Sequence, residues 1–142
     1  MKRLALVVVA SVLLLAACGG GGGGGGGDNP TGEVRTTYAT FFAANTPLAD
    51  RVALLENGPK FKPVIQGLLS NPQASGISAS VISVELQGAS KAKVVYSINI
   101  AGASLIAQTG YAVLQGGKWK VADRTFCGLV ALAGSRPAVC LQ

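Results

Sequence analysis

The chain of 142 residues contains no histidine, and only six of its residues are acidic. Without imidazole groups, histidine-based acid–base catalysis and Ser-His-Asp triads are excluded. The chain also lacks a C-x-x-C pair, and its longest glycine run lacks the lysine and hydroxyl residue of a phosphate-binding loop. We therefore expect no metal site and no cofactor.

The six carboxylates leave little room for acid–base chemistry of another kind. Asp28 and Glu33 lie in or beside a glycine-rich stretch, whereas Asp50 and Glu56 fall on the polar sides of a predicted helix. Glu85, near the end of a predicted strand, and Asp123 remain as candidates for a carboxylate-based isomerase or lyase. A glutamate at a strand end is more often solvated, so we expect no catalytic residue.

Charge of either sign is scarce, because charged residues make up 13% of the chain, with twelve basic and six acidic side chains. The basic residues are scattered, and the few aromatic residues do not interleave with them as they would on a nucleic-acid surface. We therefore expect no nucleic-acid partner. The excess of basic residues fits either ordinary solvated side chains or a weak attraction to an anionic envelope.

The N-terminus has the pattern of an export signal. Lys2 and Arg3 precede twelve apolar or small residues, a length that suits a signal peptide and is too short to span a bilayer as a helix. Leu15-Ala16-Ala17-Cys18 then resembles a bacterial lipobox. We predict a signal peptide over residues 1–17, cleavage between Ala17 and Cys18, and acylation of Cys18. The protein would then lie on the extracytoplasmic face of the cell membrane. An ordinary secretory signal or an uncleaved anchor are the alternatives.

Nine consecutive glycines follow Cys18. Glycine has no side chain to bury and loses the most backbone freedom on ordering, so this stretch is predicted to be a flexible linker over residues 18–32. The remaining residues, 33–142, are enough for one domain with its own core.

The first half of this domain has apolar residues at helical spacing. The stripes predict helices over 33–44, 47–57 and 61–69, with Thr46 as a candidate N-cap before Pro47 and with Pro63 in the first turn of the third helix. Alternating and β-branched runs then predict strands over 77–86, 92–101, 105–115 and 118–121, and Thr125 is a candidate cap for a last helix over 125–133. This order predicts an α+β fold in which the helices pack on a curved antiparallel sheet of about four strands.

If Cys18 is acylated, Cys127 and Cys140 remain as an even pair in an oxidising compartment. We expect them to form a structural disulfide that fixes the C-terminal tail to the last helix. A redox or metal site is the alternative, and no neighbouring histidine or carboxylate supports it.

Three segments carry a resemblance to a known family: FFAANTPLADRVALLENG, AKVVYSINIAG and GGKWKVADRTFC. Together they resemble the C-terminal domain of the mycobacterial low-molecular-weight antigens, which is similar to the nuclear transport factor 2 or SnoaL-like superfamily. The resemblance implies a cone-shaped domain with a pocket at its wide end, and an actinobacterial source. It implies no mechanism. The antigens that name the family are secreted, whereas Cys18 indicates a tethered protein.

Three classes of function remain open. The first, which we favour, is a non-catalytic, membrane-tethered binding module for an envelope lipid or another hydrophobic ligand. The second is a small SnoaL-like isomerase or lyase, and the third is a protein-interaction domain or antigen, including a homodimer through the open sheet face. Apolar and aromatic residues of the helices and sheet are candidates for the pocket lining, unless they simply fill the core: Tyr38, Phe41, Phe42, Phe61, Tyr96 and Ile98.

Overall fold

The computed structural model describes residues 29–72 and 76–142. The predicted signal peptide, the predicted cleavage site between Ala17 and Cys18, and the predicted acylation site at Cys18 lie outside the described residues, as does most of the predicted linker. Within the described ranges, no helix combines the length and the apolar character that crossing a membrane requires.

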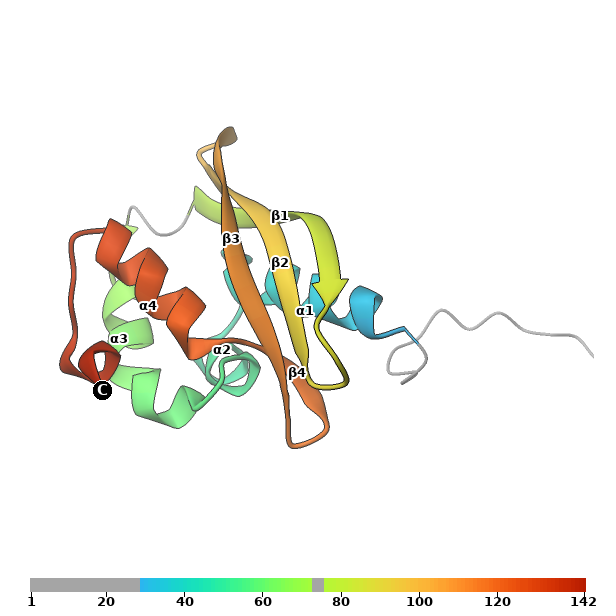
Figure 1. The fold of residues 1–142 in the computed structure, drawn as a ribbon. Helices are drawn as coiled ribbons and strands as arrows, with labels where there is room; N and C mark the ends of the chain where they lie inside the picture. The colour runs from blue at the N-terminus through green and yellow to red at the C-terminus, as the bar shows by residue number, and fades with distance from the viewer. Residues whose placement is uncertain (1–28, 73–75) are drawn as a thin grey trace, which may run out of the picture.

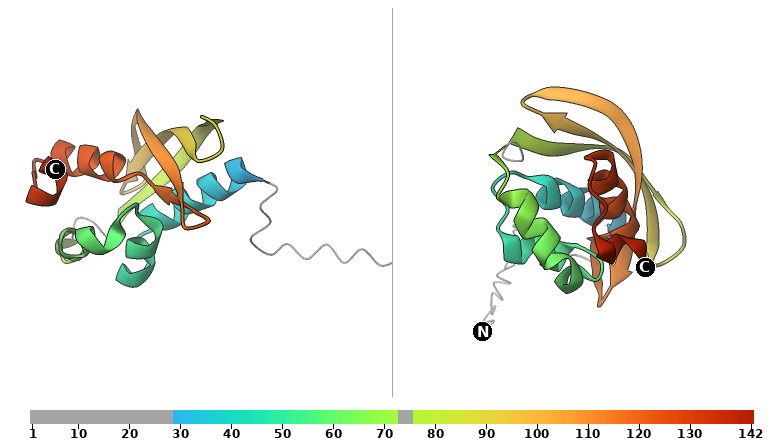
Figure 2. Two further views of the ribbon diagram at one scale, coloured as in Figure 1. Left: turned by 60° about the horizontal axis from the view of Figure 1, so that its bottom comes forward. Right: turned by 90° about the vertical axis from the view of Figure 1, so that its left-hand side faces the viewer.

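The sheet is an antiparallel meander of four strands in the order β1-β2-β3-β4 (Figure 1). Its strands are β1 (Ile77–Leu86), β2 (Lys91–Ile100), β3 (Ala103–Gln115) and β4 (Lys118–Val121). Gly116 and Gly117, with φ of 62° and 75°, form the tight turn between β3 and β4, as the sequence predicts. The sheet curls strongly and arches around the helices (Figure 2). The predicted α+β class is therefore confirmed.

Four helices lie on the concave side of this sheet, with α3 and α4 at its open end (Figures 1 and 2): α1 (Pro30–Phe42), α2 (Leu48–Leu54), α3 (Gly58–Leu69) and α4 (Asp123–Leu132). A 3₁₀ helix that the sequence did not predict, η2 (Ala138–Leu141), follows α4. Helix α1 begins three residues earlier than predicted. The Asn29 side chain accepts a hydrogen bond from the Gly32 amide at 3.0 Å, and Pro30 suits the first turn because it needs no amide partner there.

Two predicted caps and one proline position are wrong. Helix α4 begins at Asp123, and the Thr125 hydroxyl instead accepts a hydrogen bond from the Tyr111 amide at 2.8 Å, which ties α4 to β3. Thr46 lies ahead of α2 and donates to the Thr40 carbonyl. Pro63 lies inside α3 rather than in its first turn, because that helix already begins at Gly58 with Pro59 next in the chain.

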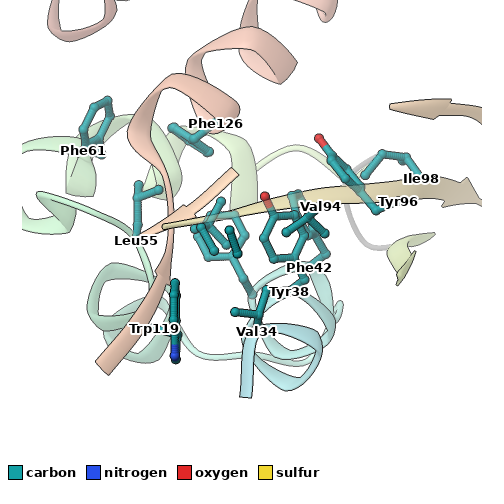
Figure 3. Close-up of a cluster of buried hydrophobic side chains, with 14 of the residues drawn as sticks. Val34, Tyr38, Phe42, Leu55, Phe61, Val94, Tyr96, Ile98, Trp119 and Phe126 are labelled. Atoms are coloured by element: carbon teal, nitrogen blue, oxygen red, sulfur yellow. The ribbon is translucent and has the colours of Figure 1, made fainter. Parts of the chain in front are cut away.

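The core lies between the concave face of the sheet and α1. Val94, Tyr96 and Ile98 alternate along β2 as predicted and are buried, whereas Ile100 at the end of this row is exposed. Tyr38 and Phe42 of α1 pack against the Tyr96 ring, with ring centroids 5.2 Å and 5.8 Å apart (Figure 3). These contacts are the edge-on and offset arrangements that aromatic rings favour.

A β-bulge at Ile82 decides which way the end of β1 faces. Val81 pairs with Tyr96 and Ser83 with Val95, so one extra residue interrupts the alternation. Val81 and Val84 are therefore the partly buried positions on either side of the bulge, and Glu85 is exposed. The Arg35 guanidinium donates to the carbonyls of Val81 and Ile82 and holds the bulge against α1. Because of this bulge, Glu85 does not share the inward face of Val81, and its exposure agrees with the expectation that a glutamate at this strand end is solvated.

Cys127 of α4 and Cys140 of η2 form the predicted disulfide, with Cα atoms 5.5 Å apart. The two residues are 13 positions apart in sequence. In the chain-entropy description, closing a loop of this size stabilises the fold by about 3 kcal/mol. The bond fixes the C-terminal segment against the outer part of α4.

Candidate ligand-binding pocket

A cavity of about 340 Å³ opens between α3, α4 and the curled end of the sheet. The C-terminal end of α1 contributes Phe41 and Phe42 to its lining, and the ends of β1 and β2 contribute Ile77, Ile98 and Ile100. The remaining apolar wall comes from α3, the start of β3, and α4 with its last cap residue: Ile65, Leu68, Leu69, Leu105, Phe126, Leu129, Val130, Leu132 and Ala133. The right-hand view of Figure 2 shows how the sheet arches over α3 and α4, the elements that supply these walls.

Four of the apolar side chains that line the pocket are exposed to solvent. Leu69, Ile100, Leu105 and Leu132 all line it and are all exposed to solvent, Leu132 by 72% and Leu105 by 50%. They come from four different elements that meet only in the folded chain. Single exposed leucines are common on proteins, whereas a group of them around a concave apolar surface is typical of a binding site.

Arg51 and Gln108 are the polar side chains in the described lining of this pocket. The Arg51 guanidinium donates from Nε to the Thr46 carbonyl at 3.0 Å and from Nη1 to the Phe41 carbonyl at 2.7 Å, and from Nη2 to the Ala43 carbonyl. It thereby satisfies carbonyls at the end of α1. Burial lowers the pKa of Arg51, because an apolar surrounding disfavours the charged form.

Residues 28–137 match a family described as the C-terminal domain of the low molecular weight antigen MTB12. The chain belongs to this family. The match covers nearly all of the folded part and confirms the resemblance seen in the sequence, while the wider relation to the nuclear transport factor 2 superfamily stays a prediction. No curated protein gives a significant match.

Three of the six residues predicted to line a pocket in this antigen-family domain do so, namely Phe41, Phe42 and Ile98. Tyr38, Phe61 and Tyr96 are not among the lining residues and are buried in the core, which is the alternative that the sequence left open. Tyr38 is fully buried, and its hydroxyl donates to the Tyr111 carbonyl at 2.8 Å instead of facing a ligand. The polar groups of the pocket are therefore not tyrosine hydroxyls.

In this antigen-family domain the two buried tyrosines and the two candidate acids all lie outside the described lining of the pocket. Burial raises the pKa of Tyr38, and it raises the pKa of Tyr96 to about 12, so both phenols stay protonated at neutral pH. Glu85 is exposed on β1, and Asp123 accepts a hydrogen bond from the Asn57 amide group at 3.0 Å. Neither carboxylate lines the pocket. Within the part of the chain that the structure describes, no group of three acidic or cysteine side chains is placed to hold a metal ion.

Arg51 is the functional candidate that the sequence interpretation missed. With Leu48, Val52 and Leu55 as the apolar stripe of this helix, the sequence predicts that Arg51 points to solvent together with Asp50 and Glu56. Arg51 is three residues after Leu48 and four before Leu55, so it shares their face at helical spacing. That spacing was a usable signal for a cation turned toward the protein.

Proposed function

We propose that the folded domain is a non-catalytic binding module that holds one apolar or amphipathic molecule in the pocket between α3, α4 and the sheet. The observation that carries the proposal is the exposed apolar side chains around an apolar cavity. The exposure of four large aliphatic side chains to water is unfavourable in free energy. A ligand in the pocket would cover part of that apolar surface, and this burial would favour binding.

The size of the pocket limits the ligand. Its volume of about 340 Å³ is near the lower end of the range of roughly 300–1,000 Å³ that small-molecule sites span. This favours a single acyl chain or a small fused-ring molecule over a complete two-chain lipid. The positions of Glu85 and Asp123 outside the pocket support binding over an isomerase or lyase reaction, since such chemistry requires a carboxylate in contact with the ligand.

We also propose that Cys18 carries the lipid anchor that holds this module at the membrane. The support is the order of Leu15, Ala16, Ala17 and Cys18 after an apolar segment of signal-peptide length. We expect the wild-type chain to incorporate labelled fatty acid and to fractionate with membranes, and Cys18→Ser to stay unlabelled and uncleaved. Recovery of mature, unacylated wild-type protein with a different N-terminus would contradict this part.

Tryptophan substitutions at two alanines of the same helical segment test whether the pocket is the binding site. Ala133 lines the pocket, whereas Ala131 lies on the other side of α4 beside Cys127 and Cys140. We expect the full chain to bind a neutral naphthylamine fluorophore, Ala133→Trp to weaken that binding at least about tenfold by filling the cavity, and Ala131→Trp to bind as the wild type does. The measurement is a fluorescence titration at equilibrium. Equal affinities of the two folded variants, or no binding by the wild type, would contradict the proposal.

A further inference from the structure

Arg51 gives a mostly apolar pocket a positive charge. We propose that the ligand of this pocket is a long-chain carboxylate, with its carboxylate bound by the Arg51 guanidinium and its hydrocarbon chain against the aliphatic wall. This inference rests on the proposed binding function and narrows it to one chemical class.

The hydrogen bonds of Arg51 leave it able to bind an anion. A guanidinium has five N–H groups, and Arg51 uses three of them, one on each nitrogen, for the carbonyls of Thr46, Phe41 and Ala43. All three acceptors are neutral, so they satisfy hydrogen bonds without balancing the charge. Two N–H groups remain for a further acceptor among the described residues. A carboxylate would supply the missing negative charge and can accept both of them.

The three carbonyls also fix the guanidinium in position. Phe41 and Ala43 lie at the C-terminal end of α1, and Thr46 precedes α2, so the Arg51 head group is held at a junction of two helices. A side chain held in this way loses little further freedom when a ligand binds. The aliphatic lining of the same pocket includes the exposed Leu105 and Leu132, so a hydrocarbon chain whose carboxylate is bound by Arg51 has apolar surface to lie against up to the solvent.

A purely structural role for Arg51 is the competing explanation, and Arg35 shows what that role looks like. The Arg35 guanidinium also donates to two backbone carbonyls, those of Val81 and Ile82, but it is exposed and lies outside the pocket. Arg35→Gln is therefore a matched control, because it removes the same charge and a similar set of backbone hydrogen bonds without touching the pocket.

The test compares three probes that share a twelve-carbon chain: dodecanoate, dodecan-1-ol and dodecylamine at neutral pH. We expect the full chain to bind dodecanoate about tenfold more tightly than the alcohol, which is what one charge-assisted hydrogen-bonded contact supplies. Dodecylamine should bind most weakly, because its cation meets the Arg51 cation. The three affinities are measured on the wild-type chain by displacement of the neutral fluorophore. This comparison therefore tests the proposal even if a variant fails to fold.

Variants then assign the preference to the residue. Arg51→Gln should reduce the preference for dodecanoate over the alcohol to less than about twofold, while Arg35→Gln should keep it. If the wild type binds the alcohol or the amine as tightly as dodecanoate, or if a folded Arg51→Gln keeps the tenfold preference, the inference is overturned. If the fluorophore binds and none of the three twelve-carbon probes displaces it, the proposal of a long-chain carboxylate ligand is wrong, whereas the assignment of the pocket as a binding site remains. If the fluorophore itself does not bind, the proposed function fails as well.

Discussion

Replacing Gly58 with alanine is expected to destabilise the fold by about 3 kcal/mol or more, one of the largest effects of any single methyl group in this chain. A Cβ atom at Gly58 would lie 1.8 Å from the Val52 carbonyl oxygen and 2.7 Å from the Val52 carbonyl carbon. Both are backbone atoms of α2, so no side-chain rotation relieves the clash. The measurement is the free energy of unfolding of the full chain in urea.

The surrounding backbone has little freedom to move away from such a methyl group. The Glu56 amide donates to the Val121 carbonyl at 2.9 Å, and Leu55 forms a bridge to Val121 of β4. The segment between α2 and α3 is therefore fixed to the sheet on one side while α3 begins on the other. A shift that accommodates alanine would break these contacts, which is why we expect loss of stability rather than local adjustment.

Gly67→Ala in the same helix is the matched control. A Cβ atom at Gly67 meets no heavy atom within 4 Å, and the position is exposed. Alanine is the better helix former, so this change should stabilise the protein by about 0.5–1 kcal/mol. Similar unfolding free energies for the two variants would contradict the packing of α2 against the start of α3.

Tyr38→Ala is expected to cost about 3–5 kcal/mol, the range for deleting a buried aromatic side chain. Tyr38 is fully buried and its ring contacts those of Phe42 and Tyr96. Tyr38→Phe keeps these ring contacts and removes only the hydrogen bond to the Tyr111 carbonyl, so it should cost about 1 kcal/mol. Both values come from urea unfolding of the full chain.

Tyr38→Phe also distinguishes a role of Tyr38 in the core from a role in ligand binding. Because Tyr38 does not line the pocket, we expect Tyr38→Phe to bind the neutral fluorophore with the wild-type affinity. A folded Tyr38→Phe variant that binds the fluorophore tenfold more weakly would show that the hydroxyl reaches the ligand, and that the predicted pocket lining was right for this residue.

Strand positions were predictable because local chemistry determines them. The predicted bounds of β1 and β4 agree with the structure. The β-branched residues of β1 end just before a turn that contains Gly88, and β4 begins directly after the turn at Gly117. Helix starts were less accurate. Helix α4 begins two residues before Thr125. The Thr125 hydroxyl accepts a hydrogen bond from the Tyr111 amide of β3, a contact that no local sequence pattern indicates.

The site was predictable only in part, for two physical reasons. The bulge at Ile82 turns Glu85 outward, and its hydrogen-bond partner Arg35 is 46 residues from Val81 in the sequence, so no local pattern indicates this contact. Aromatic residues at helical spacing indicate a buried face, but they do not show whether that face fills the core, as Tyr38 does, or borders a cavity, as Phe41 does. That distinction arises from how far the sheet curls, a property of the whole fold.

Mass spectrometry of the small molecules that co-purify with the full chain from its native membranes tests the binding proposal most directly. We expect about one equivalent of a single-chain amphipathic molecule with a carboxylate group, retained by Ala131→Trp and absent from Ala133→Trp. A wild-type protein that carries no such molecule, or a molecule that persists in the folded Ala133→Trp variant, would contradict the assignment of this pocket as the binding site.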